Sequence, residues 1–404
     1  MTLLEFFTES HIDNIAACLR LHPENMIIVG SIDQMRDPVK RYRELLKQRK
    51  QRTEITMCDV QGKDLGQIWE VLNRLVRVND QVVIDLTGGD ETVLLAVGAV
   101  LAGLDAIKRQ SIRVEKFDHE HGTVVDCLNG NRILPTKAIT LTVEELISLH
   151  GGSIHPDTYQ PPADCRCSEL DGLWNIVSRM PRTWNDSIPK LNEFESRADS
   201  KTQIFLPLAY LRRSIHECEQ KEQSVRELLD KLDDAGVIYN ESTHTSLEYT
   251  YRSPMLRYCT QKAGNVLEVK TLLEGRAAQE NGKPLFQDCR MSVGIDWDGL
   301  VDAQGFDTCN EIDVVLMHGT TPLFVSCKNG NVDKDEPYKL HTVATRFGGP
   351  YARKMLIVTD PGQKKGRAYQ TLRQRASDMG ISFVSNAAKL TPQEWSQIFI
   401  QAML

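Results

Sequence analysis

The sequence lacks the features of a membrane-spanning or exported chain. No apolar run in its 404 residues reaches the ~20 residues that a transmembrane helix needs. The first segment, Met1 to Phe7, is short and contains Glu5, so it fits neither a signal peptide nor a span. We therefore expect a cytoplasmic protein, and its length predicts about two to three domains.

Paired cysteine motifs are also missing. The chain has ten cysteines, but none of them forms a CxxC pair. Cys165 and Cys167 are the one close pair, and no second pair with zinc-site spacing accompanies them. This scatter predicts reduced thiols in and around hydrophobic cores, and it argues against a disulfide framework.

Positive charge is in deficit over the whole chain. The net charge of −7 argues against a protein coated in nucleic acid, although it permits a local basic groove. One basic stretch runs from Arg36 to Arg52, and we interpret it as a solvated helix face. A second stretch is the better candidate for a substrate groove, and it contains Arg353, Lys354, Lys364, Lys365, Arg367, Arg373 and Arg375.

The first 150 residues or so alternate between strand and helix patterns. We expect strands at 26–30, 54–60, 81–86, 112–117 and 123–128, separated by helices at 36–52 and 64–78 and by an apolar helix that ends near Leu104. Strands of nearly continuous apolar sequence between helices are typical of a parallel sheet covered on both faces. The sequence therefore predicts an α/β, Rossmann-like N-terminal domain.

Two loops of this domain follow predicted strands. They are Gly30 to Gln34 and Leu86 to Thr92, and neither contains GxGxxG or a Walker motif, so a dinucleotide cofactor or ATP is not indicated. Ligands of such sheets bind beyond the carboxyl ends of the strands. The glycine pair in the second loop permits close backbone approach to an anionic phosphate, although glycine pairs after strands also serve as simple tight turns.

The middle of the chain has the pattern of a connector. Residues 155–164 are rich in proline and predict an inter-domain linker. Helices are expected at 170–179, 208–216 and 224–235, with a polar stretch after the first, and a wing hairpin is expected from 237–240 and 247–251. The pattern suggests a winged-helix-like unit. Its last helix is acidic, which favours a structural or dimer-contacting role over DNA reading.

The segment from Asn310 to Gly330 predicts a β-hairpin with polar strand ends. Strand alternation places Glu311 and Asp313 on one side of the first strand, and Ser326 and Lys328 on one side of the second. A buried unpaired ammonium is costly, so Lys328 needs a partner at the end of its apolar strand. A plain ion pair with Asp313 would satisfy that need. A Mg²⁺ or Mn²⁺ site for phosphodiester cleavage would satisfy it too. After the hairpin we expect helices at 337–347, 366–379 and 391–403, and strands at 355–359 and 381–384.

The hairpin resembles the core motif of the PD-(D/E)xK nuclease superfamily. Asp313 matches the family's Asp, Cys327-Lys328 matches its xK, and Glu268 in Val-Leu-Glu-Val-Lys matches the helix carboxylate. The resemblance implies metal ligation by Asp313, Glu268 and the backbone carbonyl of Cys327, with Lys328 as transition-state stabiliser. Ser326 departs from the pattern, which has Asp or Glu there. Either another carboxylate, Glu311 or Glu336, completes the site, or the nuclease is impaired.

Nearly the whole chain resembles the CARF-domain nucleases of type III CRISPR systems. The segments that carry the resemblance are Asp85 to Asp90, Asn310 to Val314, Ser326 to Gly330 and Leu340 to Gly349. The resemblance implies a homodimer that binds one cyclic tetra-adenylate, which suits the two-fold symmetry of a ring. It also implies a ligand pocket formed by Ser31, Ile32, Asp33, Gln34, Thr87, Gly88, Gly89 and Asp90.

Three domains follow from the resemblance. They are a CARF domain at 1–154, a linker and winged-helix-like connector at 155–257, and a PD-(D/E)xK nuclease-like domain at 258–404. The expected function is a metal-dependent nuclease, activated by cyclic oligoadenylate, that cuts DNA or RNA in antiviral defence. The alternative is a cyclic-oligoadenylate-sensing regulatory protein whose nuclease domain is degenerate, and Ser326 is the residue that supports it.

Overall fold

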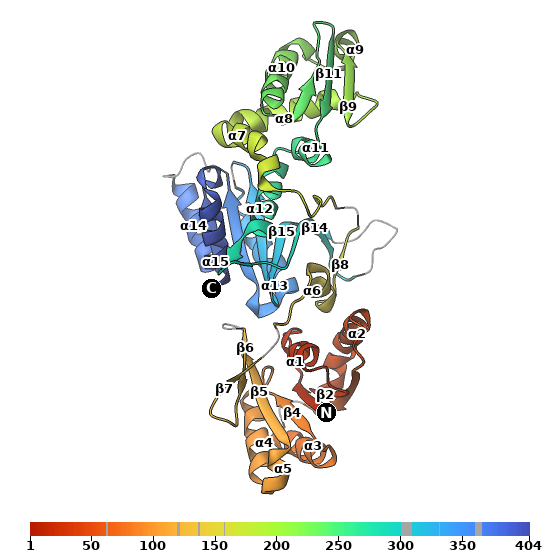
Figure 1. The fold of residues 1–404 in the computed structure, drawn as a ribbon, viewed down its shortest axis with the longest axis vertical. Coiled ribbons are helices and arrows are strands. Elements are labelled where there is room, and N and C mark those ends of the chain that lie inside the picture. The colour runs from red at the N-terminus through yellow and green to blue at the C-terminus, as the bar shows by residue number, and fades with distance from the viewer. Residues whose placement is uncertain are drawn as a thin grey trace.

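The structure is a computed structural model of the chain, and the molecule is elongated (Figure 1). The structure describes residues 1–61, 64–118, 122–135, 138–156, 158–299, 309–330, 332–359 and 366–404. The N-terminal sheet lies at one end, the second large sheet in the middle and the helical connector at the other end (Figure 1). No described helix is both long and apolar enough to span a bilayer.

The N-terminal unit is built on a seven-stranded sheet with the order β3-β2-β1-β4-β5-β6-β7. Strands β1 to β5 run parallel to one another, and β6 and β7 continue the sheet beyond β5 as antiparallel strands. Its strands are β1 Thr2–Phe6, β2 Asn25–Gly30, β3 Glu54–Asp59, β4 Val82–Asp85, β5 Ile112–Asp118, β6 Thr123–Asp126 and β7 Arg132–Leu134, and its helices are α1 Asp13–Leu21, α2 Ile32–Gln48, α3 Leu65–Val78, α4 Glu91–Ala102 and α5 Ala106–Gln110.

Helices cover both faces of this sheet, as expected for a Rossmann-like unit. Leu3 of β1 packs with α1 and α2 on one face, and its neighbour Leu4 packs with α3 and α4 on the other. Strand β1 is absent from the sequence prediction although it lies at the centre of the sheet. Its five residues are all buried, including Glu5, so it shows neither an alternating pattern nor an uninterrupted apolar run.

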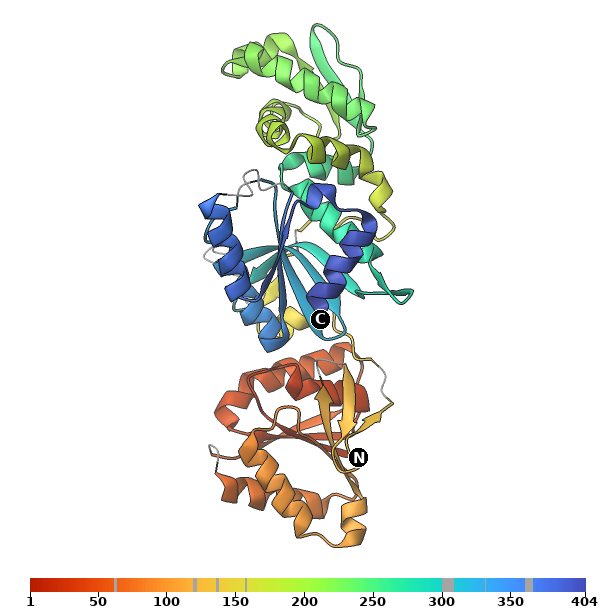
Figure 2. The same ribbon diagram turned by 90° about the vertical axis from the view of Figure 1, so that its left-hand side faces the viewer.

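The middle unit contains a six-stranded sheet with the order β18-β17-β16-β15-β14-β8. Figure 2 shows this sheet edge-on, with α14 on one side and the dark-blue α15 on the other. Its strands are β8 Ser153–Ile154, β14 Asp288–Asp296, β15 Cys309–His318, β16 Thr321–Lys328, β17 Arg353–Val358 and β18 Ile381–Ser385, and its helices are α6 Val143–Leu149, α11 Pro254–Gln261, α12 Asn265–Ala277, α13 Glu336–Gly348, α14 Arg367–Asp378 and α15 Pro392–Met403, with a small hairpin of β12 Gln279–Glu280 and β13 Lys283–Pro284.

The connector has a three-stranded sheet with the order β10-β11-β9 and four helices. These elements are α7 Asp171–Arg179, α8 Pro181–Glu195, β9 Gln203–Pro207, α9 Leu208–Ser214, α10 Cys218–Asp234, β10 Ile238–Asn240 and β11 Ser246–Tyr251. Helix α8 fills the stretch that is described from sequence only as polar. It starts on Pro181, and its buried face carries Trp184, Ile188, Leu191 and Phe194 at helical spacing, a pattern that Pro189 in the same segment obscures.

The N-terminal and middle units share one continuous hydrophobic core. It runs from α1 and α2 through α6 to the α13 face of the second sheet. The Arg41 Nε of α2 donates to the Leu149 carbonyl at 2.9 Å, and Arg49 pairs with Glu145 at 2.6 Å. The first 154 residues therefore supply α6 and β8 to the second sheet, where β8 pairs with β14.

Candidate functional site

The polar end of the β15–β16 hairpin forms a compact cluster. The antiparallel register pairs Val314 with Val325, so Asp313 and Ser326 face each other one step further along. Asp313 Oδ2 accepts hydrogen bonds from the Cys327 N–H at 2.6 Å, the Ser326 hydroxyl at 3.2 Å and the Lys328 ammonium at 3.3 Å. Ser326, Cys327 and Lys328, which are all predicted site residues, thus contact the same oxygen of Asp313.

Glu336 supplies a second carboxylate to this cluster. It is the first residue of α13, and its Oε1 lies 2.7 Å from the Ser326 hydroxyl and 3.1 Å from the Lys328 ammonium. Burial alone would lower the pKa of Lys328, but the carboxylates of Asp313 and Glu336 outweigh it and raise that pKa above its ordinary value. Helix α13 therefore places a carboxylate directly beside Ser326 and Lys328.

Glu268 reaches the cluster from helix α12. Its Oε2 accepts a hydrogen bond from the Ser292 hydroxyl at 3.4 Å. Burial, and then the negative charges of Asp313 and Glu311, raise the pKa of Glu268 to about 8, against the weaker opposing effect of Lys328 and Lys262. Glu268 is thus close enough to Asp313 to feel its charge, as a shared metal site requires.

The donor set fits a divalent cation that prefers oxygen ligands. Asp313, Glu336 and Glu268 provide carboxylate oxygens, the ligands that Mg²⁺ and Mn²⁺ favour. Within the described ranges, however, no three His, Cys, Asp or Glu side chains are already grouped as a metal site. The Lys328 ammonium lies between two of the carboxylates instead. The Cys327 thiol is buried and bonded to Thr271 at 3.5 Å, and ligation by the Cys327 carbonyl stays a prediction.

The raised pKa of Glu268 predicts a pH-dependent stability in metal-free solution. Its ordinary value of 4.5 applies to the unfolded chain, so the stabilisation by the bound proton is complete below pH ~4.5 and is lost as the pH rises through about 8. We expect Glu268→Gln, which mimics the neutral form, to exceed the wild type in stability by a few kcal/mol at pH 9 but by little at pH 5. Thermal unfolding in EDTA at both pH values measures this. An equal difference at the two pH values would contradict the assignment.

A second cavity lies at the carboxyl ends of β1, β2 and β4. Its volume is about 490 Å³. Four of the eight residues predicted to bind the ligand line it, namely Ser31, Gln34, Gly88 and Asp90. Asp90 is also the N-cap of α4, where its side chain accepts from the N–H groups of Thr92 and Val93 at 3.0 Å.

The other four predicted residues lie at the same strand ends but outside this lining. Thr87 is turned into the sheet, where its hydroxyl bonds the buried Asp85 and accepts from the Phe117 N–H at 2.8 Å. Asp33 is exposed and pairs with Arg36 at 3.7 Å. For the remaining two, the Ile32 N–H donates to Asp59 at 3.0 Å, and the Gly89 N–H donates to the Leu86 carbonyl at 3.1 Å.

The sequence prediction also missed part of the lining. Phe7, Thr8 and Glu9 follow β1 and form one wall of the cavity. They were not identifiable because β1 itself was not recognised. The close approach of this segment explains why residue 88 is glycine. A Cβ on Gly88 would lie 2.6 Å from the Phe6 carbonyl oxygen and 2.9 Å from Thr8 Cγ2.

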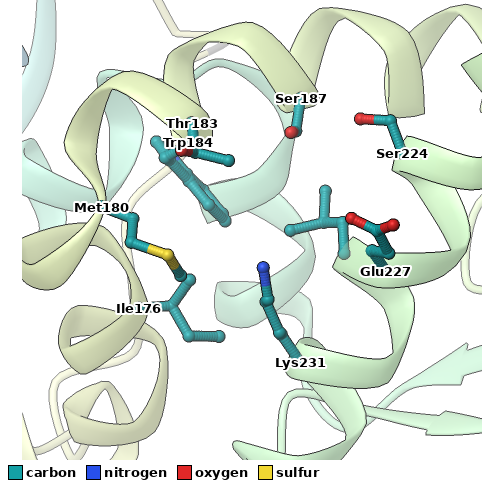
Figure 3. Close-up of a pocket in the computed structure, with 9 residues that line it drawn as sticks. Ile176, Met180, Thr183, Trp184, Ser187, Ser224, Glu227 and Lys231 are labelled. Atoms are coloured by element: carbon teal, nitrogen blue, oxygen red, sulfur yellow. The ribbon is translucent and has the colours of Figure 1, made fainter.

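Two other features lie away from the carboxylates. The basic residues Arg353 and Lys354 begin β17 beside Leu323 and Phe324, about 16 Å of strand from Lys328, and Lys364 and Lys365 fall outside the described residues. The connector has a cavity of about 30 Å³, into which Lys231 points opposite Met180 (Figure 3). This volume holds about one or two water molecules. Neither feature adds a residue to the candidate site.

Comparison with known proteins gives matches in structure. No protein-family model matches the chain, and no curated protein matches it in sequence. Protein VC1899 from Vibrio cholerae superposes with a TM-score of 0.73 and 16% identity, covering 100% of this chain and 97% of that one. Can2 from Sulfobacillus thermosulfidooxidans, solved with cyclic tetra-adenylate, gives 0.65 and 14% over 100% and 99% of the two chains.

A third solved structure, a type III CRISPR defence DNA nuclease activated by cyclic oligoadenylate, gives a TM-score of 0.46 at 15% identity. It covers 89% of this chain and 45% of the other, and at that score the likeness is too weak to show a shared fold. The two closer matches extend over the whole length of the present chain. The chain therefore shares the mixed α/β fold of VC1899 and Can2 over its whole length.

Proposed function

We propose that the protein is a metal-dependent nuclease, activated by cyclic tetra-adenylate, that cuts DNA or RNA in CRISPR antiviral defence. The observation that carries the proposal is the Lys328 ammonium, which lies 3.3 Å from Asp313 and 3.1 Å from Glu336. Glu268 is close enough to this cluster for the charges of Asp313 and Lys328 to shift its pKa. A lysine, two or three carboxylates and a strand end form a site suited to an anionic phosphodiester. A plain structural ion pair would not require the third, half-buried carboxylate.

The proposed chemistry assigns a role to each side chain. Asp313, Glu268 and Glu336 would hold Mg²⁺ or Mn²⁺, which when bound supplies an activated water and offsets phosphate charge. Lys328 would stabilise the charge that develops on the phosphate oxygens. The Ser326 hydroxyl lies within bonding distance of both carboxylates and donates its one proton to one of them at a time, with Glu336 at 2.7 Å the shorter contact. The Cys327 N–H fixes Asp313 further.

The activator would bind in the N-terminal cavity. Can2, which shares the fold, was solved with cyclic tetra-adenylate. A two-fold dimer would present the same cavity to each half of the ring. Support for a dimer comes from α3 and α4, where large apolar side chains are exposed: Leu65 by 39%, Trp69 by 41%, Leu94 by 49% and Leu95 by 60%.

Helix α2 provides a rigid connection between the two sites. Its 17 residues span about 25 Å and begin at the ligand cavity, which Gln34 lines. Further along, Arg41 bonds the end of α6, which packs on the second sheet. A ligand that binds better to one position of α2 would thereby favour one arrangement of the nuclease unit.

A sensing protein with a degenerate nuclease unit is the second candidate. Ser326 favours it, because a hydroxyl is a weak, neutral ligand where the motif has a carboxylate. The two candidates differ in one measurable property. Both predict binding of labelled cyclic tetra-adenylate, and the nuclease alone predicts cutting.

The role of Glu336 can be tested by moving its charge. We expect Glu336→Gln to lower the cleavage rate roughly 10- to 100-fold, because a ligand is lost and Lys328 keeps one carboxylate partner instead of two. Adding Ser326→Glu to this variant restores a carboxylate at the position that the motif normally uses, and should recover part of the rate. Initial rates with saturating Mn²⁺ measure both. Unchanged cutting by Glu336→Gln would remove it from the site.

A further inference from the structure

A cleft of about 630 Å³ lies beside the carboxylate cluster and has no role in the proposal so far. The linker, the connector and the second sheet each contribute a wall. Its sheet wall includes Gly294 of β14 and Glu311 of β15, which are paired neighbours in the sheet. Glu311 lies on the same face of its strand as Asp313, so the cleft opens onto the candidate active site.

Two buried polar atoms in the linker wall are left without partners. The Nε2 of His155 and the hydroxyl of Tyr159 make no hydrogen bond in the part of the chain that the structure describes. Both residues line the cleft. Buried polar groups are almost always satisfied, so two unsatisfied ones make this wall an unusual part of the fold. Burial raises the pKa of Tyr159 to about 12, which keeps its hydroxyl a neutral donor at neutral pH.

An aromatic pair connects this wall to the active site. The Tyr159 ring stacks on Tyr258 with centroids 4.4 Å apart and an interplanar angle of 22°. The Tyr258 hydroxyl bonds Ser292 Oγ at 2.8 Å, and the Ser292 hydroxyl in turn donates to Glu268 at 3.4 Å. Only two hydrogen bonds therefore separate the ring pair from a candidate metal ligand.

The backbone at Ser292 is also unusual. This residue has a φ of +47°, although it lies within β14 between Met291 and Val293, which pair with Val314 and Ile312 of β15. Non-glycine residues in this conformation are uncommon in strands and gather at functional sites. Here the conformation directs the hydroxyl toward Tyr258 and Glu268.

The cleft also has a free positive charge at its rim. Lys201 is exposed and lines the cleft, and within the described ranges its ammonium has no ion-pair or hydrogen-bond partner. The other cation of the wall, Arg257, is already engaged by Glu195 at 2.6 Å. Lys262 is close enough to Glu268 to lower its pKa. Lys201 and Arg257 thus place positive charge on the cleft wall.

We propose that this cleft binds one unpaired nucleotide of the substrate, next to the phosphate that is cut. Its base would stack on the Tyr159–Tyr258 pair, and Lys201 would bind a neighbouring phosphate. Aromatic side chains beside cations are the usual means of holding single-stranded nucleic acid. A base in this position must be out of a duplex. The inference rests on the proposed nuclease function and adds to it a subsite and a requirement for an unpaired base.

Binding without cutting tests this subsite. The full-length protein is mixed with cyclic tetra-adenylate and EDTA, and the anisotropy of labelled oligothymidylate, oligouridylate and a blunt hairpin duplex is recorded. We expect Tyr159→Leu to weaken single-strand binding about tenfold. Tyr210→Leu, at a tyrosine of the connector that is 51% exposed, is the matched control and should bind as the wild type does.

Lys201→Gln provides a second variant at an exposed position that does not risk the fold. It should reduce the slope of log affinity against log salt by about 0.7, the value for one phosphate contact on a single strand. Lys283→Gln, on the exposed β12–β13 hairpin, should leave the slope unchanged. The proposal is overturned if Tyr159→Leu and Lys201→Gln both bind as the wild type does, if the wild type binds no single strand, or if the Tyr159 effect is equal on the duplex.

Binding and cutting together distinguish the subsite from the nuclease activity. Weakened single-strand binding by the two variants, in a protein that never cuts, would support the subsite and contradict the nuclease. Cutting by the wild type together with unaltered binding by the variants would support the nuclease and contradict the subsite.

Discussion

Replacing Lys328 with alanine should lower the cleavage rate about 100- to 1,000-fold, the loss typical of removing one preorganised group that stabilises charge in a transition state. The Lys328 ammonium lies beside Asp313 and Glu336, which keep it charged and at the site where the phosphate would bind. The measurement is the initial rate of cutting with Mn²⁺ and cyclic tetra-adenylate.

The control for this variant is a lysine outside the site. Lys283→Ala, on the exposed β12–β13 hairpin, should cut at the wild-type rate. Binding of cyclic tetra-adenylate by Lys328→Ala should also be unchanged, which shows that the variant is folded. A Lys328→Ala protein that binds the activator and cuts normally would remove Lys328 from the mechanism.

A second large effect is expected at the ligand cavity. In Gly88→Ala the new methyl group would meet the Phe6 carbonyl at 2.6 Å, and a backbone atom cannot yield as a flexible side chain does. The loop must therefore shift away from β1, and we expect the affinity for cyclic tetra-adenylate to fall at least about tenfold. Titration with labelled activator measures this, and the activator concentration needed for half-maximal cutting should rise in parallel.

Gly103→Ala is the matched control for Gly88→Ala. At that position, the C-cap of α4, the nearest atom to an added Cβ is the Val100 carbonyl oxygen at an ordinary contact distance of 3.6 Å. This variant should bind the activator as the wild type does. Equal affinities for Gly88→Ala and Gly103→Ala would place the activator outside this cavity.

The hairpin shows why part of the candidate site was predictable from sequence. Strand alternation has a fixed period of two, so the polar residues at 311, 313, 326 and 328 could be assigned to strand faces without a structure. Their close contact in the structure follows from the hairpin register. Glu336 remained one of two alternatives because it begins a helix eight residues after the strand, and no periodic rule says where that helix packs.

Missed elements had a different cause. Strands β1 and β14 and helix α8 contain charged residues or proline inside buried segments, such as Glu5 and Pro189, which tertiary contacts tolerate and pattern rules penalise. The walls of the cleft beside the carboxylate cluster come from the linker, the connector and the second sheet, which are brought together by folding. The sequence alone therefore indicates the hairpin chemistry, whereas the binding surfaces around it require the structure.

The most direct test of the account is a cleavage assay in which metal and activator are varied independently. The substrates are single-stranded and plasmid DNA and single-stranded RNA, each incubated with Mn²⁺, with cyclic tetra-adenylate, with both and with neither. We expect cutting when both are present, little or none when either is omitted, and about 100- to 1,000-fold slower cutting by Lys328→Ala. Binding of the activator without cutting of any substrate would contradict it and identify the protein as a sensor, with Ser326 as the first residue to examine.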